Sequence, residues 1–87
     1  MVKKIILLTT KRCPYCPIAK DLWESLKKDY EFDFEEIDAF TPEGQAIVKQ
    51  FNLSSVPTTI LDENGKREVI FIGVPNKEEA IKILAGE

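Results

Sequence analysis

The only two cysteines of the chain, Cys13 and Cys16, are separated by two residues. Thiols at this spacing can exchange a disulfide with a partner: one thiolate attacks the partner's bond, and the second thiol then releases the partner. The same spacing supplies half of a tetrahedral zinc site. Because the sequence has no histidine and no third cysteine, a zinc site within one chain would lack two such ligands. We therefore expect redox chemistry and no metal.

The dithiol falls where a strand is followed by a helix. The apolar run Ile5 to Leu8 predicts a buried strand over about Lys4 to Thr9. After the cysteines, apolar residues recur at helical spacing and predict a helix over about Pro14 to Lys28, with a first turn that Pro17 can make irregular. Trp23 lies on the apolar stripe of that helix, which indicates packing in the core rather than stacking on a ligand.

A helix N-terminus favours a thiolate, because its dipole and its unpaired N–H groups are positive. Lys11 and Arg12 add positive charge beside the cysteines, so we expect both to stabilise the thiolate. Cys13 is then the thiol that ionises, and Cys16, one turn further into the helix, is the thiol that resolves a mixed disulfide.

The middle of the chain predicts a strand and a helix. Residues Tyr30 to Asp38 alternate between apolar and charged, although Ile37 rather than Glu36 is apolar, which indicates the end of the strand or a bulge. Asp38 is expected to act in a loop or cap rather than as a proton acceptor for the dithiol. Thr41-Pro42-Glu43 predicts the start of a helix that ends at Asn52.

The last third of the chain predicts a hairpin and a helix. Asn64-Gly65 between the apolar runs Ile60-Leu61 and Val69 to Ile72 is typical of a two-residue β-turn. Asn76, with Glu79 three residues later, predicts the start of the last helix. The expected order is βαβαββα in one domain, residues 1–87, an α/β fold with a four-stranded mixed sheet flanked by helices. The first two strands should be parallel, because a helix connects them.

Composition excludes several partners. The net charge is −3 and the isoelectric point is near 5.0, which argues against binding to nucleic acid or to an anionic membrane. The longest apolar run is too short for a signal-peptide core or a membrane span. We expect a monomer that resides in the cytoplasm. In that compartment, neighbouring cysteines are more often catalytic than structural.

The sequence resembles the thioredoxin-like superfamily over its whole length. Cys13-Pro14-Tyr15-Cys16 matches the active site of dithiol glutaredoxins, and Val56-Pro57-Thr58 resembles the loop that carries the cis-proline of the superfamily. The stretch Cys13 to Ala19 is also similar to the active site of archaeal protein disulfide oxidoreductases, and the chain has the size of one of their two units.

This resemblance implies the thioredoxin fold and a set of site residues. Cys13 is the nucleophile, Cys16 is the resolving thiol, Pro57 is the cis residue, and the backbone of Val56 pairs with an extended substrate segment. The residues implied to bind substrate are Pro14, Tyr15, Val56, Pro57 and Thr58.

The sequence departs from both branches of the superfamily. Thr10 stands where glutaredoxins usually place a glutathione-binding Lys or Arg, and Gly73-Val74 replaces their Gly-Gly. Leu7 stands where thioredoxins carry a buried acid, and Arg12 where they carry a tryptophan.

We therefore expect an enzyme without a bound cofactor that reduces protein disulfides and is recharged by a flavoprotein of the thioredoxin-reductase type. One alternative is a glutaredoxin that depends on glutathione. Another is a non-enzymatic carrier in which two chains share an iron–sulfur cluster through Cys13 and glutathione. A third is a redox-inert adaptor, which the intact dithiol disfavours.

Overall fold

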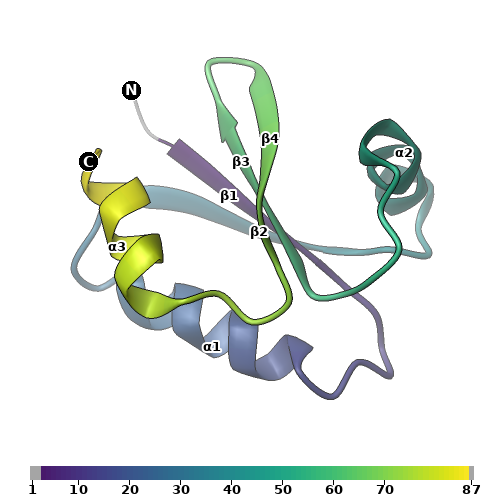
Figure 1. The fold of residues 1–87 in the computed structure, drawn as a ribbon, viewed down its shortest axis with the longest axis horizontal. Coiled ribbons are helices and arrows are strands. Elements are labelled where there is room, and N and C mark those ends of the chain that lie inside the picture. Colours follow the sequence, from purple (N-terminus) through teal and green to yellow (C-terminus); the bar gives the residue numbers. More distant parts are fainter. Residues whose placement is uncertain (1–2, 87) are drawn as a thin grey trace.

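The structure is a computed structural model, and it describes residues 3–86. The elements follow the predicted order βαβαββα (Figure 1). Their bounds are β1 Lys3–Thr9, α1 Cys16–Leu26, β2 Phe32–Asp38, α2 Pro42–Phe51, β3 Thr58–Glu63, β4 Lys66–Ile72 and α3 Lys77–Ala85.

The four strands form one mixed sheet in the order β2-β1-β3-β4. β1 pairs with β2 in parallel and with β3 antiparallel, and β3 pairs antiparallel with β4. β1 therefore lies inside the sheet, with neighbours along both of its edges. Its apolar stretch, Ile5 to Leu8, is buried on both faces of the sheet, as expected for a continuous apolar run.

Helices cover both faces of the sheet: α1 and α3 lie on one face, and α2 lies on the other (Figure 1). Successive residues of β1 point to opposite faces and so contribute to two separate cores. The core under α1 and α3 consists of Ile5, Leu7, Ala19, Trp23, Leu26, Phe32 and Ala80. The core under α2 consists of Ile6, Leu8, Ile37, Ala39, Ile47 and Ile60.

The predicted boundaries of α2 are confirmed. The hydroxyl of Thr41 accepts a hydrogen bond from the Gly44 N–H at 3.1 Å, which caps the helix, and Asn52 ends it at a left-handed φ of 54°. Gly44 lies so close to the preceding chain that an added Cβ would overlap the backbone of Asp38 and Ala39. The absence of a side chain thus lets α2 start directly against the end of β2.

The hairpin and the last helix also follow the prediction. Asn64 and Gly65 both have positive φ, 57° and 81°, as a two-residue turn between right-twisted strands requires. A register shift lies between Thr59 and Ile60, where β3 pairs with β4. In α3, Asn76 Oδ1 accepts a hydrogen bond from the Glu79 N–H at 3.1 Å.

The prediction for the start of α1 was wrong: the helix begins at Cys16, not at Pro14. A helix starting at Pro14 would need a hydrogen bond from the residue 17 N–H to the Cys13 carbonyl, and Pro17 has no N–H to donate. The Ala19 N–H instead bonds to the Tyr15 carbonyl at 3.1 Å. The helix also ends at Leu26, two residues before the predicted end at Lys28.

The predicted break in the second strand was also wrong. The parallel pairing of β1 with β2 runs without interruption from Lys3–Phe32 to Thr9–Asp38. The strand starts at Phe32 rather than Tyr30 and continues through Glu36 and Ile37. Ile37 packs into the core under α2, so Glu36 points to the opposite face, toward α1.

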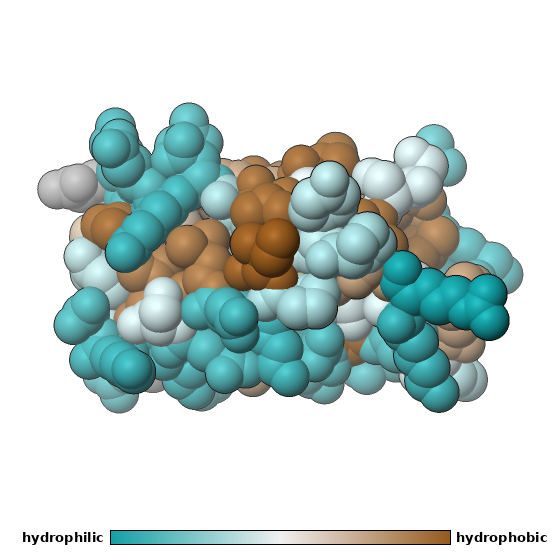
Figure 2. Space-filling view, turned by 90° about the horizontal axis from the view of Figure 1, so that it is seen from below, coloured by the Kyte–Doolittle hydropathy of each residue, from teal (hydrophilic) through white to brown (hydrophobic). Residues whose placement is uncertain are grey.

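Among the helices of residues 3–86, none is both long enough and apolar enough to cross a bilayer. The face seen from below in Figure 2 has hydrophobic side chains in its middle and hydrophilic side chains toward both ends.

Candidate active site

Cys13 and Cys16 form a disulfide, and their Cα atoms are 5.4 Å apart. Cys13 lies in the turn between β1 and α1, where its N–H donates to the Thr10 carbonyl at 3.3 Å. Cys16 is the first residue of α1 and is only 3% exposed, whereas Cys13 is half-buried. The two sulfurs are therefore unequal: a partner reaches Cys13 more readily than Cys16.

The later start of α1 changes the relation of the cysteines to the helix. Cys13 precedes the N-cap residue, Tyr15, and Cys16 opens the helix instead of lying one turn inside it. Both sulfurs thus lie at the positive end of the α1 dipole, a position that favours a thiolate.

A cavity of about 400 Å³ lies beside the disulfide. Its walls come from the β1–α1 turn, the first three turns of α1 and the end of β2. The lining residues are Thr10, Lys11, Cys13, Cys16, Pro17, Lys20, Asp21, Glu24 and Glu36.

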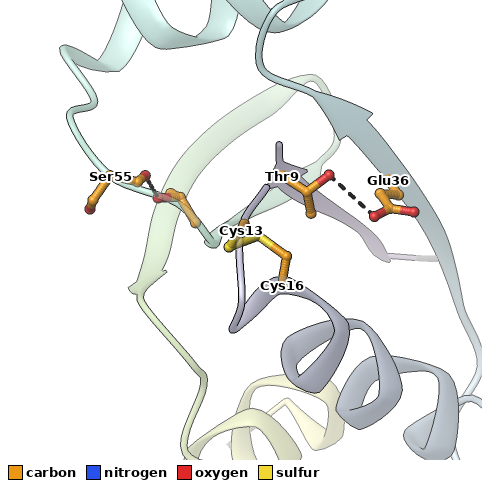
Figure 3. The surroundings of a disulfide bond; sticks show 6 residues. Thr9, Cys13, Cys16, Glu36 and Ser55 are labelled. Carbon is orange, nitrogen blue, oxygen red and sulfur yellow. Dashed lines mark hydrogen bonds between the residues drawn. A yellow bond between two sulfur atoms is a disulfide. The ribbon is translucent and has the colours of Figure 1, made fainter. Parts of the chain in front are cut away.

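Glu36 is the carboxylate of this cavity that contacts two different elements. Its Oε2 accepts a hydrogen bond from the Thr9 hydroxyl at 3.2 Å, and its Oε1 lies 3.3 Å from Lys20 Nζ. Figure 3 shows Thr9 and Glu36 on one side of the Cys13–Cys16 bond. A carboxylate so placed can accept a proton, directly or through a water molecule, from a thiol that lines the same cavity.

Glu36 was not predicted as a site residue, because the apolar Ile37 was interpreted as the end of regular alternation. An unbroken period of two from Phe32 would have placed Glu36 on the face of α1. Asp38, the acid considered instead, has the predicted loop role: its Oδ1 accepts a hydrogen bond from the Phe40 N–H at 2.8 Å. Asp38 does not line the cavity that holds the two cysteines.

The loop before β3 lies on the other side of the disulfide, where Figure 3 shows Ser55. The Val56–Pro57 peptide bond is cis, as predicted. Pro57 and Thr58 are buried, and the Thr58 hydroxyl donates to the Ser55 carbonyl at 2.7 Å. Within residues 3–86, no hydrogen bond involves the backbone N–H or C=O of Val56. This backbone therefore retains a donor and an acceptor for a partner.

The remaining predicted site residues lie on the surface of the β1–α1 turn. Pro14 is exposed and the Tyr15 side chain is 60% exposed, next to the disulfide in sequence. Lys11 lines the cavity of the cysteines, but Arg12 does not. Arg12 lines a neighbouring cavity of about 650 Å³, together with Thr10, Lys11, Asp38, Phe40 and Thr41.

No cluster of three or more His, Cys, Asp or Glu side chains is arranged to hold a metal ion in the part of the chain that the structure describes.

Comparison with known proteins identifies the family. The family model described as "Thioredoxin domain" matches residues 1–85. The chain belongs to the thioredoxin domain family. A "Probable Thioredoxin" of Methanothermobacter marburgensis is 35% identical over 100% of this chain and 98% of that protein. A "Thioredoxin" of Methanocaldococcus jannaschii is 35% identical over 91% of this chain and 92% of its own length.

Solved thioredoxins share the fold at low sequence identity. Thioredoxin-2 of a malaria parasite superposes with a TM-score of 0.81 at 18% identity, over 99% of this chain and 84% of that one. A mutant thioredoxin from Halobacterium salinarum superposes with a TM-score of 0.79 at 19% identity, over 97% of this chain and 73% of that one. The predicted thioredoxin fold is thus confirmed. With its Cys13–Cys16 pair, this member of the family is a thiol–disulfide oxidoreductase.

Proposed function

We propose that this chain, as a single domain of residues 1–87, reduces disulfides in other proteins through Cys13 and Cys16. The observation that carries the proposal is the inequality of the two sulfurs, since Cys13 is accessible and Cys16 is 3% exposed. A reductase of this kind needs one thiol that reaches the substrate and a second thiol that attacks only after the first has reacted.

In the first step, the thiolate of Cys13 attacks one sulfur of the substrate disulfide. The substrate S–S bond breaks, a mixed disulfide with Cys13 forms, and the leaving sulfur takes a proton from solvent. In the second step, Cys16 loses its proton and attacks the sulfur of Cys13. The second substrate sulfur leaves and takes up a proton. The substrate gains two electrons and two protons, and the dithiol of this protein loses the same number.

Glu36 is proposed to receive the proton of Cys16. Burial disfavours the charged form of a thiol, so the second step requires an acceptor near Cys16. The Glu36 carboxylate lines the cavity that Cys16 lines, and contacts with Thr9 and Lys20 fix its two oxygens. The cavity of about 400 Å³ has room for a water molecule that would relay the proton.

The Val56 loop is proposed to hold the substrate. Val56 follows Ser55, which Figure 3 shows beside the disulfide, and its free backbone N–H and C=O can pair with an extended substrate segment. Backbone pairing of this type tolerates many substrate sequences. Tyr15 and Pro14 are proposed to contact the same segment from the side of the β1–α1 turn.

The electron donor is proposed to be a flavoprotein of the thioredoxin-reductase type. The sequence supports this choice, because Thr10 occupies the position of the glutathione-binding cation of glutaredoxins and Val74 occupies that of their second glycine. The two relatives at 35% identity, named "Probable Thioredoxin" and "Thioredoxin", support it as well.

Trapping tests the proposal. The Cys16→Ser variant should accumulate mixed disulfides with protein substrates on Cys13, whereas the matched Cys13→Ser variant should accumulate none. A Cys16→Ser variant that reduced protein disulfides at the original rate would contradict the two-thiol mechanism.

The donor is tested by coupled turnover with either an NADPH-dependent thioredoxin reductase or glutathione with glutathione reductase. Faster turnover with the flavoprotein is expected. Turnover with glutathione alone would identify the protein as a glutaredoxin. An absorption spectrum of protein purified without oxygen tests the iron–sulfur alternative, for which a visible cluster band would be required.

A further inference from the structure

The surface on the Arg12 side of the dithiol combines exposed positive charge with an exposed aromatic ring. We call this surface the Arg12–Phe40 groove; it is the cavity of about 650 Å³ lined by Thr10, Lys11, Arg12, Asp38, Phe40 and Thr41. Phe40 is 79% exposed, the highest value among the exposed large hydrophobic residues of the described chain. Neither Lys11 nor Arg12 forms an ion pair with any residue of the described range 3–86.

The position of Phe40 is fixed by the elements on either side of it. Its N–H donates to Asp38 Oδ1 at 2.8 Å. Asp38 is the single carboxylate of the groove, against the two cations Lys11 and Arg12. The close approach of Gly44 holds the start of α2 against Asp38 and Ala39. Phe40 therefore projects outward from a short, well-anchored connection between β2 and α2.

The groove is continuous with the proposed substrate loop. Phe40 also lines a cavity of about 220 Å³ that is lined as well by Ser54, Ser55 and Val56. Thr10 lines this cavity, the groove and the cavity of the cysteines. A segment that passes the disulfide and pairs with Val56 can thus extend over Phe40 toward Arg12.

The opposite side of the dithiol carries the opposite charge. The cavity of the cysteines contains three carboxylates, from Asp21, Glu24 and Glu36, and two amines, from Lys11 and Lys20. Lys20 is shared between Glu24 at 3.8 Å and Glu36 at 3.3 Å. An acidic substrate residue would therefore be repelled on this side and attracted on the side of Arg12.

We propose that the Arg12–Phe40 groove binds one flank of the substrate cysteine and selects protein disulfides in which that flank carries an acidic residue beside an apolar one. The apolar side chain contacts Phe40, and the acidic side chain lies against Lys11 and Arg12. This inference rests on the proposed reduction of protein disulfides and names the class of substrate that the protein prefers.

The test uses the full chain and a set of peptides of equal length, each with one intramolecular disulfide. One flank carries Glu-Leu, Gln-Leu or Lys-Leu, and each pair is placed either before or after the cysteines. In one of the two placements, kcat/KM should fall in the order Glu, Gln, Lys, with about a two- to tenfold ratio between the Glu and Lys peptides, as expected for exposed ion pairs. This ratio should shrink as salt is added.

The ratio of kcat/KM for the Glu peptide to kcat/KM for the Lys peptide distinguishes docking from an effect on the thiolate. A change in the thiolate would alter kcat/KM equally for all peptides and leave this ratio unchanged. Arg12→Glu should invert the ratio, whereas the matched control Lys66→Glu, on the distant β3–β4 hairpin, should leave it unchanged. Phe40→Ala should lower kcat/KM for all three peptides and keep the ratio. The proposal would be overturned if the native protein gave the same Glu-to-Lys ratio of kcat/KM in both placements. It would also be overturned if Arg12→Glu lowered kcat/KM equally for every peptide.

A second readout does not depend on turnover. Peptides with serine in place of both cysteines are titrated against the oxidised protein, and the amide NMR signals are followed. The Glu-Leu peptide should shift the signals of Arg12 and Phe40 more than the Lys-Leu peptide does. If these shifts occur but the cysteine peptides are not reduced, the proposed function is contradicted and the proposed binding in the groove still stands. Equal shifts with both peptides would overturn the proposed binding in the groove.

Discussion

The indole Nε1 of Trp23 donates a hydrogen bond to the Thr59 hydroxyl at 3.2 Å, and both residues are completely buried. Trp23 belongs to α1, which starts at the resolving cysteine, and Thr59 follows the cis Val56–Pro57 bond in β3. This one bond therefore joins the helix that carries Cys16 to the strand that carries the Val56 loop.

Removal of the Thr59 hydroxyl should destabilise the protein. Thr59→Val conserves the volume of the side chain but leaves the Trp23 N–H buried without an acceptor, which costs about 1–3 kcal/mol. Urea unfolding followed by Trp23 fluorescence measures the loss. Thr59→Ser, which keeps the hydroxyl, is the matched control and should lose less. Equal stability of Thr59→Val and the native protein would show that the bond contributes nothing.

Neutralisation of Glu36 should slow the second step of the reaction. Glu36→Gln keeps an acceptor for the Thr9 hydroxyl but removes the carboxylate that takes the Cys16 proton, so release of the substrate should slow by up to about a hundredfold. Rapid-quench measurement of the Cys13 mixed disulfide as a function of pH isolates this step. Glu24→Gln, on the same cavity, should change the rate little. Similar rates for the two variants would assign the effect to general charge in the cavity.

Cys13 should react with an alkylating reagent well before Cys16. Cys13 is half-buried and Cys16 is 3% exposed, and both lie at the positive end of α1. Brief treatment of the reduced protein at about pH 6, where an ordinary thiol is almost fully protonated, followed by peptide mass spectrometry, gives the order. Modification of Cys16 first would reverse the proposed roles.

The Lys4–Glu35 pair should make the stability depend on alkaline pH. Glu35 Oε1 lies 2.6 Å from Lys4 Nζ, and this hydrogen bond raises the pKa of Lys4 above its ordinary value. A pKa that is higher in the folded state favours folding while Lys4 is protonated, and this contribution disappears as the pH rises through the folded-state pKa. Because both side chains are over a third exposed, the loss should stay below about 1 kcal/mol.

Urea unfolding at neutral pH and at a pH above the pKa of Lys4 measures this loss. The Glu35→Gln variant should show a smaller decrease between the two conditions than the native protein. Identical decreases would mean that other lysines cause the alkaline effect.

Local signals predicted the elements that depend on local chemistry. Thr41-Pro42 caps α2, Asn64-Gly65 forms the hairpin turn, and the apolar run of β1 lies inside the sheet. The dithiol and the cis bond before Pro57 were predicted because short motifs carry them.

Errors arose where the structure depends on a missing hydrogen bond or on an alternation that one residue obscures. The start of α1 depends on the N–H that Pro17 lacks, which helical periodicity does not reveal. The orientation of Glu36 follows from unbroken alternation along β2, which the apolar Ile37 obscured in the sequence. The turn also places Arg12 on the neighbouring groove with Phe40, a neighbour that its position in the sequence does not reveal.

The location of the dithiol at the end of β1 has a consequence for amide hydrogen exchange. β1 has a hydrogen-bonded strand on each side, so its amides should exchange only when the sheet opens. The turn from Thr10 to Tyr15 is mostly exposed and has one internal backbone bond, from the Cys13 N–H to the Thr10 carbonyl, so its amides should exchange through small local openings. A steep gradient of protection should therefore fall where β1 ends, between Thr9 and Lys11. The sulfurs can then adapt to partners of different shape while the sheet stays closed.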